Sequence, residues 1–265
     1  MGKRRNHIRW KCFLFAGAVL CGMEGLIGCS TVLPVGAAEE TEANLELLNK
    51  SDDELYYDAV KDAMTVEEEE MLPVISLARG EPYACYEDRG ERLLLITYHG
   101  EPQNYPTGAS VRLRRGDVWV FAGGEMADWY EVNKKDLRDP GRRFRQLFGL
   151  SYDSPATYFT AFWVKPQDVI RPAYTTDITV KEVPGEFPVD MHPEYRQWFE
   201  DQIIEKYFDG FEPWTRLGYT YDWAGNGTEY GLSEFLIKNG SEVEIAYTCT
   251  REEFQDKLED GSWRP

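Results

Sequence analysis

The stretch PWTRLGYTYDWAGNGTEYGLSEFLIKNGSEVEIAYTC, residues 213–249, carries the strongest fold signal in the chain. Apolar and polar side chains alternate over 216–223 and again over 242–247, which is the period of a strand with one buried face. Between them, Asn239-Gly240 favours a two-residue hairpin, because both positions tolerate positive φ. A Thr-x-x-Glu capping box at 250–253 then indicates the start of a helix. The stretch predicts a three-stranded antiparallel meander followed by a C-terminal helix.

The chain outside this stretch predicts further strands and helices. Proline in the first helical turn predicts helices that begin at Pro140 and Pro193, whereas Gly123-Gly124 indicates an irregular segment. Short apolar runs bounded by turn residues predict strands at 92–99, 117–121, 158–164 and 177–183. We therefore expect an α+β fold, with a single domain over residues 73–265. It would contain a mainly antiparallel sheet, the C-terminal meander and several packed helices.

The first 38 residues have the organisation of a bacterial signal peptide. A basic start is followed by an apolar run at 12–23 and then by small residues. The apolar run is shorter than the roughly 20 residues that a membrane-spanning helix needs. Two processing sites remain open. Cleavage near 28/29 would leave Cys29 lipidated and anchor the protein on the outer face of the cell membrane, whereas cleavage near 37/38 would release a secreted protein.

The charge distribution is strongly acidic. The chain has a formal net charge of -18, and residues 39–70 contain thirteen Asp and Glu against two Lys. A capping box at 51–54 is followed by apolar residues at helical spacing. This pattern predicts that residues 39–72 form an acidic helical arm. Because this charge repels phosphate groups, we expect no nucleic-acid partner, and membrane contact only through a lipid at Cys29.

Two cysteines, Cys85 and Cys249, follow the predicted leader and its processing sites. In an exported protein they could form one disulfide or remain thiols, and their separation in sequence does not decide between the two. A structural zinc site usually takes four Cys or His ligands, more than this part of the chain supplies in a recognisable pattern. We therefore expect neither a metal nor a cofactor.

Several segments resemble a family of exported bacterial proteins of uncharacterised function. The C-terminal signature of that family is similar to PWTRLGYTYDW followed by YGLSEFLI. The resemblance extends upstream through LLLITYHGEPQNYPTG, GDVWV, RQLFGL, AFWVKPQDVIRP and YRQWF. It implies one secreted or envelope-associated domain and carries no catalytic assignment.

A site is expected on the polar face of the predicted meander. Asp222 and Glu234 lie on adjacent predicted strands, so they could form a pair of carboxylates that divide acid and base roles. Ligand contacts are expected from Arg216, Tyr221, Trp223 and Arg171, because aromatic rings can stack on sugars and arginines can bind anions. The alternative is structural: Asp222 caps the turn or pairs with Arg216, and Glu234 is an ordinary exposed strand residue. His99, at the end of a predicted strand beside a Pro- and Gly-rich loop, is the one histidine worth testing.

Glu234 also belongs to a second resemblance. The pattern Glu-Phe-Leu-Ile-x-x-Gly-Ser-x-Val-x-Ile from Glu234 to Ile245 is similar to the strand that carries the catalytic glutamate of mono-ADP-ribosyltransferases. Tyr98-His99-Gly100 is similar to the histidine strand of another branch of that superfamily. Leu232 departs from the pattern, since many of these enzymes carry the first acid of a Glu-x-Glu pair there.

Three functions remain open on these residues. The lack of a complete catalytic constellation favours a non-catalytic interaction module that binds an unknown protein or glycan at the cell envelope. The alternative is a secreted hydrolase or glycan-active enzyme that uses Asp222 and Glu234. A third reading is an ADP-ribosyltransferase-like enzyme that uses Glu234.

Overall fold

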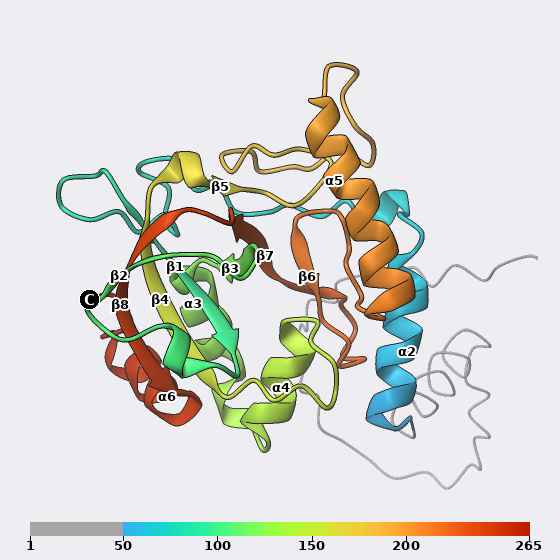
Figure 1. Cartoon of the computed structure of the whole chain (residues 1–265). Helices are drawn as coiled ribbons and strands as arrows, with labels where there is room; N and C mark the ends of the chain where they lie inside the picture. The colour runs from blue at the N-terminus through green and yellow to red at the C-terminus, as the bar shows by residue number, and fades with distance from the viewer. Residues whose placement is uncertain (1–49) are drawn as a thin grey trace, which may run out of the picture. The chain divides into compact units, whose positions relative to one another are not determined.

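Eight strands form one antiparallel sheet in the part of the chain that the structure, a computed structural model, describes, residues 50–265 (Figure 1). The order is β2-β8-β4-β1-β3-β7-β5, and β6 also pairs with β7. The expected α+β domain with a mainly antiparallel sheet is confirmed. The strands are β1 Leu93–His99, β2 Ser110–Arg112, β3 Val118–Phe121, β4 Tyr158–Val164, β5 Val169–Ile170, β6 Tyr219–Tyr221, β7 Tyr230–Ile237 and β8 Glu242–Thr250.

Helices begin where capping residues predict them. The Asp139 side chain accepts a hydrogen bond from the backbone N–H of Arg142 at the start of α4. Capping boxes at Ser51 and Thr250 open α2 and α6, because each pairs a hydroxyl with a glutamate three residues later. The helices are α2 Asp52–Ala63, α3 Gly123–Asn133, α4 Pro140–Leu147, α5 Pro193–Ile204, which continues as a π-helix over Glu205–Asp209, and α6 Arg251–Asp260.

The predicted C-terminal meander is wrong. β6 and β7 pair as expected, but β8 pairs with β4 and β2, and three strands separate it from β7. In a flat sheet, β7 and β8 would be about 19 Å apart, more than the roughly 17 Å that their connection over 238–241 can span. The sheet must therefore curl so that the turn bridges strands that are not neighbours, and Figure 1 shows this curl.

Two local predictions also fail. Residues 123–133 form α3, although Gly123-Gly124 indicated an irregular segment. The glycines are needed for packing, since a Cβ at Gly123 would lie 2.6 Å from the Trp263 ring. Residues 177–183 form no strand and instead bond through isolated carbonyls to the backbone of Val74 and Leu77.

The core lies on both faces of the sheet. Along β1, alternate residues enter two different apolar clusters, which explains why six consecutive residues of this strand are buried. Helices α3, α4 and α6 cover one face, where Phe159 of β4 stacks on Phe254 of α6 at 4.0 Å between ring centroids. The other cluster fills the concave side of the curled sheet with residues such as Leu95, Phe162 and Phe235.

The described part of the acidic arm packs against the domain. Tyr56 and Val60 of α2 contact Trp223, and Arg142 of α4 forms an ion pair with Asp52 at 2.5 Å. The predicted signal peptide and Cys29 lie outside the described residues. Within residues 50–265, no helix is long and apolar enough to cross a membrane.

Candidate functional site

A cleft opens where two central strands separate. β1 and β3 pair through Ile96 and Phe121, and beyond this pair the end of β1 and the start of β3 line opposite sides of the cavity. Its volume is 310 Å³, at the lower end of the range for small-molecule sites. The separation exposes strand edges to a ligand, so the sheet itself supplies the walls of the site.

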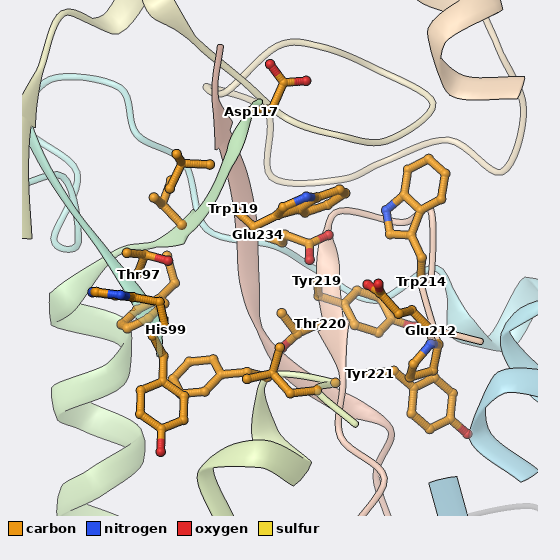
Figure 2. Close-up of a pocket in the computed structure, with 18 of the residues that line it drawn as sticks. Thr97, His99, Asp117, Trp119, Glu212, Trp214, Tyr219, Thr220, Tyr221 and Glu234 are labelled. Carbon is orange, nitrogen blue, oxygen red and sulfur yellow. The ribbon is translucent and has the colours of Figure 1, made fainter. Parts of the chain in front are cut away.

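Glu234 of β7 lies at the centre of this cleft. Its backbone pairs with Phe121 of β3, and Figure 2 shows its carboxylate below the Trp119 ring with Trp214 and Glu212 nearby. The residue is 9% exposed, and its Oε2 atom has no hydrogen-bond partner. An unpaired buried polar group typically costs about 1 to 3 kcal/mol, so this carboxylate contributes nothing to folding that would explain its place.

Burial is the main cause that raises the pKa of Glu234 to about 8, and the neighbouring Glu212 contributes to this increase. Lys206 and Arg171 act in the opposite direction, because positive charge favours the ionised form. Glu234 is therefore mostly protonated at pH 7 in the free protein. A cation placed beside it would lower its pKa and release the proton.

Aromatic and charged side chains form the mouth of the cleft. Trp119 and Trp214 pack edge to face, with ring centroids 6.1 Å apart. Lys206 of the π-helix lies 5.0 Å from the centre of the Trp119 ring and forms an ion pair with Glu212 at 2.5 Å. Tyr221 forms another wall, and its hydroxyl donates to Asp62 of α2.

His99 borders the cleft, but its ring nitrogens are already engaged. Nδ1 accepts the backbone N–H of Glu101 at 3.1 Å, and Nε2 lies 2.7 Å from Oγ1 of Thr160. Burial lowers the pKa of His99 to about 4, so the ring is neutral and Nε2 carries the hydrogen. Figure 2 shows the ring directed away from Glu234. His99 can shape the wall of the site, but it is poorly placed to act as its base.

The structure does not bring Asp222 and Glu234 together as a pair. Both carboxylate oxygens of Asp222 accept hydrogen bonds from Arg143, at 2.9 and 2.5 Å, and Asp222 does not line the cleft. Asp222 therefore has the structural role of an ion-pair partner, but it pairs with Arg143 and not with the expected Arg216. The second carboxylate near Glu234 is Glu212, from the loop before β6.

Three of the four residues that we expected to contact a ligand instead stabilise the fold. Arg171 is fully buried and donates to backbone carbonyls, among them Ile75 at 2.7 Å. Arg216 donates to the carbonyl of Ala63 at 2.8 Å, at the end of α2. The indole of Trp223 donates to the carbonyl of Leu150. Of the four, only Tyr221 lines the cleft.

Cys85 and Cys249 are free thiols that pack at the same apolar cluster. Burial raises the pKa of Cys249 to about 12, so this thiol is not activated for nucleophilic chemistry.

Carboxylates also gather beside the arm. Asp62, Glu70 and Glu229 offer oxygens within 4.8 Å of one another, a spacing that could hold a cation. Burial is the main cause that raises the pKa of Glu70 to about 7, and the nearby carboxylates of Glu229 and Asp62 add to it. Such clusters are common at protein surfaces without an ion, so this one carries no metal assignment.

The residues that sequence reasoning missed at the site are Trp119, Lys206 and Glu212. Trp119 belongs to a predicted strand, and only the separation of β1 from β3 turns it toward a ligand. Lys206 lies in the continuation of the helix that begins at Pro193, and Glu212 lies in the loop after it; neither position belongs to a recognisable motif. Comparison of the chain with known protein families, with characterised proteins and with solved structures found no match.

Proposed function

We propose that the protein binds NAD⁺ in this cleft and cleaves the bond between nicotinamide and ribose, with Glu234 as the catalytic carboxylate. One observation carries the proposal. Two segments that resemble ADP-ribosyltransferase strands, the His99 strand and the Glu234 strand, are 135 positions apart in the sequence and border the same cleft. A single strand, β3, lies between them. The resemblance of two short motifs thus gains support from their convergence.

The chemistry needs few groups from the protein. When the bond from ribose C1′ to the nicotinamide nitrogen breaks, its electron pair neutralises the positive pyridinium ring, so this leaving group needs no general acid. Positive charge develops on the ribose, as in glycoside hydrolysis. A carboxylate beside it stabilises this charge, and water or an acceptor then attacks C1′ and loses a proton. One buried carboxylate is enough for this reaction, and Glu234 is such a group.

The electrostatics of the cleft also suit NAD⁺. The pyridinium ring would bring a positive charge next to Glu234 and so favour its ionised form. Lys206 is the one Lys or Arg among the described residues that line the cleft, and it could bind the pyrophosphate. The rings of Trp119 and Trp214 offer surfaces for stacking. The volume of 310 Å³ suits the nicotinamide riboside half, with the rest of the ligand extending past the mouth.

Leu232 stands where many of these enzymes carry the first acid of the Glu-x-Glu pair. Leu232 is buried in the core, so β7 supplies one acid to the cleft where a Glu-x-Glu pair would supply two. We therefore propose cleavage of NAD⁺ and leave the acceptor as water or a nucleophile from another molecule. The expected non-catalytic module is less well supported, because a buried carboxyl with an unpaired oxygen has no structural purpose here.

A glycan-active hydrolase is the second function that a specific observation favours. The raised pKa of Glu234, about 8, is what a general acid needs, and Glu212 offers a second carboxylate nearby. This pair would replace Asp222 and Glu234. The two functions differ in their pH dependence: a general acid loses activity as pH rises through 8, whereas NAD⁺ cleavage gains it.

We also propose that the protein works outside the cytoplasm, secreted or lipid-anchored at Cys29. The support is the basic and apolar leader and the small residues that follow it. Lipidation can be checked separately. A Cys29→Ala protein that fractionates with membranes as fully as the wild type would contradict it.

The decisive experiment measures nicotinamide release from NAD⁺ by the purified domain. We expect release by the wild type and at least a 100-fold loss in Glu234→Gln, which keeps the shape of the side chain. Glu242→Gln on β8 is the matched control, since this glutamate is exposed and is not among the residues that line the cleft. Release that survives in Glu234→Gln would refute the assignment, and binding of NAD⁺ without release would favour the non-catalytic module.

A further inference from the structure

Three large apolar side chains are exposed at the end of α5 and in the turn that follows it. Ile204 is 56% exposed, Phe208 is 61% exposed and Phe211 is 50% exposed. Ile204 and Phe208 are four residues apart, so they lie on the same side of the helix. Groups of exposed apolar side chains mark sites of interaction on protein surfaces. We call these three residues the Phe208 patch.

Phe211 has a backbone conformation that a phenylalanine rarely adopts. Its φ is 51°, in the left-handed region that favours glycine and asparagine. Backbone hydrogen bonds hold the turn on both sides of it. The N–H of Gly210 donates to the carbonyl of Glu205, and the N–H of Glu212 donates to that of Lys206. The fold thus keeps a bulky, half-exposed ring at a strained position, which is typical of residues with a role in binding.

The patch is carried on a rigid support beside the cleft. In the π-helix, Lys206 and Tyr207 are buried one after the other, and Phe208 is exposed. Lys206 forms its ion pair with Glu212 at 2.5 Å, and the hydroxyl of Tyr207 donates to the carbonyl of Ala63 at 2.8 Å. Because Lys206 and Glu212 also line the cleft, a partner bound on the patch would lie next to its mouth.

The surroundings of the patch are acidic, and this decides which partner fits. Segment 200–212 contains one lysine, which is buried, against five acids: Glu200, Asp201, Glu205, Asp209 and Glu212. This charge repels an anionic lipid surface. A second copy of the chain would bring two such acidic segments face to face. The complementary partner has apolar side chains for the rings and positive charges for the carboxylates around them.

We propose that the Phe208 patch binds a polypeptide segment in which apolar side chains are interspersed with lysine or arginine. The apolar side chains of the partner would cover Phe208 and Phe211, and its cations would pair with exposed carboxylates such as Asp209. This inference goes beyond NAD⁺ cleavage and does not depend on it, since the three residues of the patch are not among those that line the cleft.

Fluorescence anisotropy with two labelled peptides measures this binding. One peptide alternates lysine with leucine, and the other alternates lysine with glycine and has the same charge. We expect the wild type to bind the leucine peptide about 10-fold more tightly, and Phe208→Gln or Phe211→Asn to remove this preference. Because asparagine tolerates positive φ, Phe211→Asn should also raise the Tm by about 2 to 4 °C. Val132→Gln on α3 is the matched control, since it removes another exposed apolar side chain and should leave binding unchanged.

Equal affinity of the wild type for both peptides would overturn the proposal, because charge alone would then explain the binding. A Phe211→Asn protein that gains stability and keeps its preference for leucine would overturn it as well. Binding to phosphatidylserine vesicles would assign the patch to a membrane, and dimerisation in sedimentation that Phe211→Asn abolishes would assign it to a second copy. Nicotinamide release should be equal in the wild type and Phe211→Asn, so failure of the peptide test leaves the proposed function standing.

Discussion

Replacing Glu234 with glutamine should make the protein more stable while it abolishes nicotinamide release. The carboxyl is 9% exposed and has an unpaired oxygen, and burial raises its pKa to about 8. In the unfolded chain its pKa returns to an ordinary 4.5. Folding at pH 7 therefore requires Glu234 to bind a proton, and this lowers the free energy of unfolding. A glutamine side chain is neutral and has no such cost.

The magnitude follows from the pKa difference. The folded state binds more protons than the unfolded state between pH 4.5 and 8, so the stability of the wild type falls as pH rises through this window. At 1.36 kcal/mol per pKa unit, the cost is under 1 kcal/mol at pH 5 and about 3 kcal/mol at pH 7. It approaches about 5 kcal/mol above pH 8.5 and then becomes constant.

Urea unfolding at pH 5, 7 and 8.5 measures the difference in unfolding free energy between Glu234→Gln and the wild type. Glu125→Gln is a useful contrast, since Glu125 is also buried but accepts hydrogen bonds from Tyr230 and Ser233. An amide there would set its N–H₂ against these donors and should destabilise the fold. A stability gain in Glu234→Gln that does not grow with pH would refute the reasoning.

Three further predictions concern other parts of the molecule. NAD⁺ affinity should rise about 50-fold from pH 6 to pH 8 in calorimetric titration and then level off, because the ligand selects ionised Glu234, and Glu234→Gln should remove this rise. Arg143→Met should destabilise the fold by about 3 to 5 kcal/mol in urea unfolding, because it leaves Asp222 buried and unpaired. Thr250→Ala should cost about 1 kcal/mol in the same assay by removing the cap of α6, with no change in NAD⁺ binding.

Local signals predicted the fold class better than the order of the strands. The caps of α2, α4 and α6 and the strong strands β1 and β4 could be located because short-range chemistry decides them. The turn at Asn239-Gly240 is a different case. Such a dipeptide favours a reversal of the chain, but it does not fix which strand becomes the neighbour. Here the curl of the sheet decides, and β8 pairs with β4 in place of β7.

The candidate site was predicted in part. The motif around Glu234 and the position of His99 at a strand end predict both as site residues, and both border the cleft. The choice of Asp222 as the partner assumed that adjacent strands present their acids to the same space. Asp222 instead follows the end of β6 and meets Arg143 from α4, a contact across 79 positions that no local pattern reports.

A comparison of two buried glutamates indicates that the cleft is a functional site and not a packing defect. Glu125 and Glu234 are about equally buried, and burial raises both pKa values, to about 7 and about 8. Glu125 accepts three hydrogen bonds, so its burial serves to hold the backbone of β7. Glu125 bonds to Ser233 of β7. Glu234 is the next residue of that strand; it faces the cavity, and its Oε2 atom has no hydrogen-bond partner. Because the fold satisfies the buried carboxylate of Glu125 on α3 beside this strand, the unpaired oxygen of Glu234 indicates that its partner is a ligand.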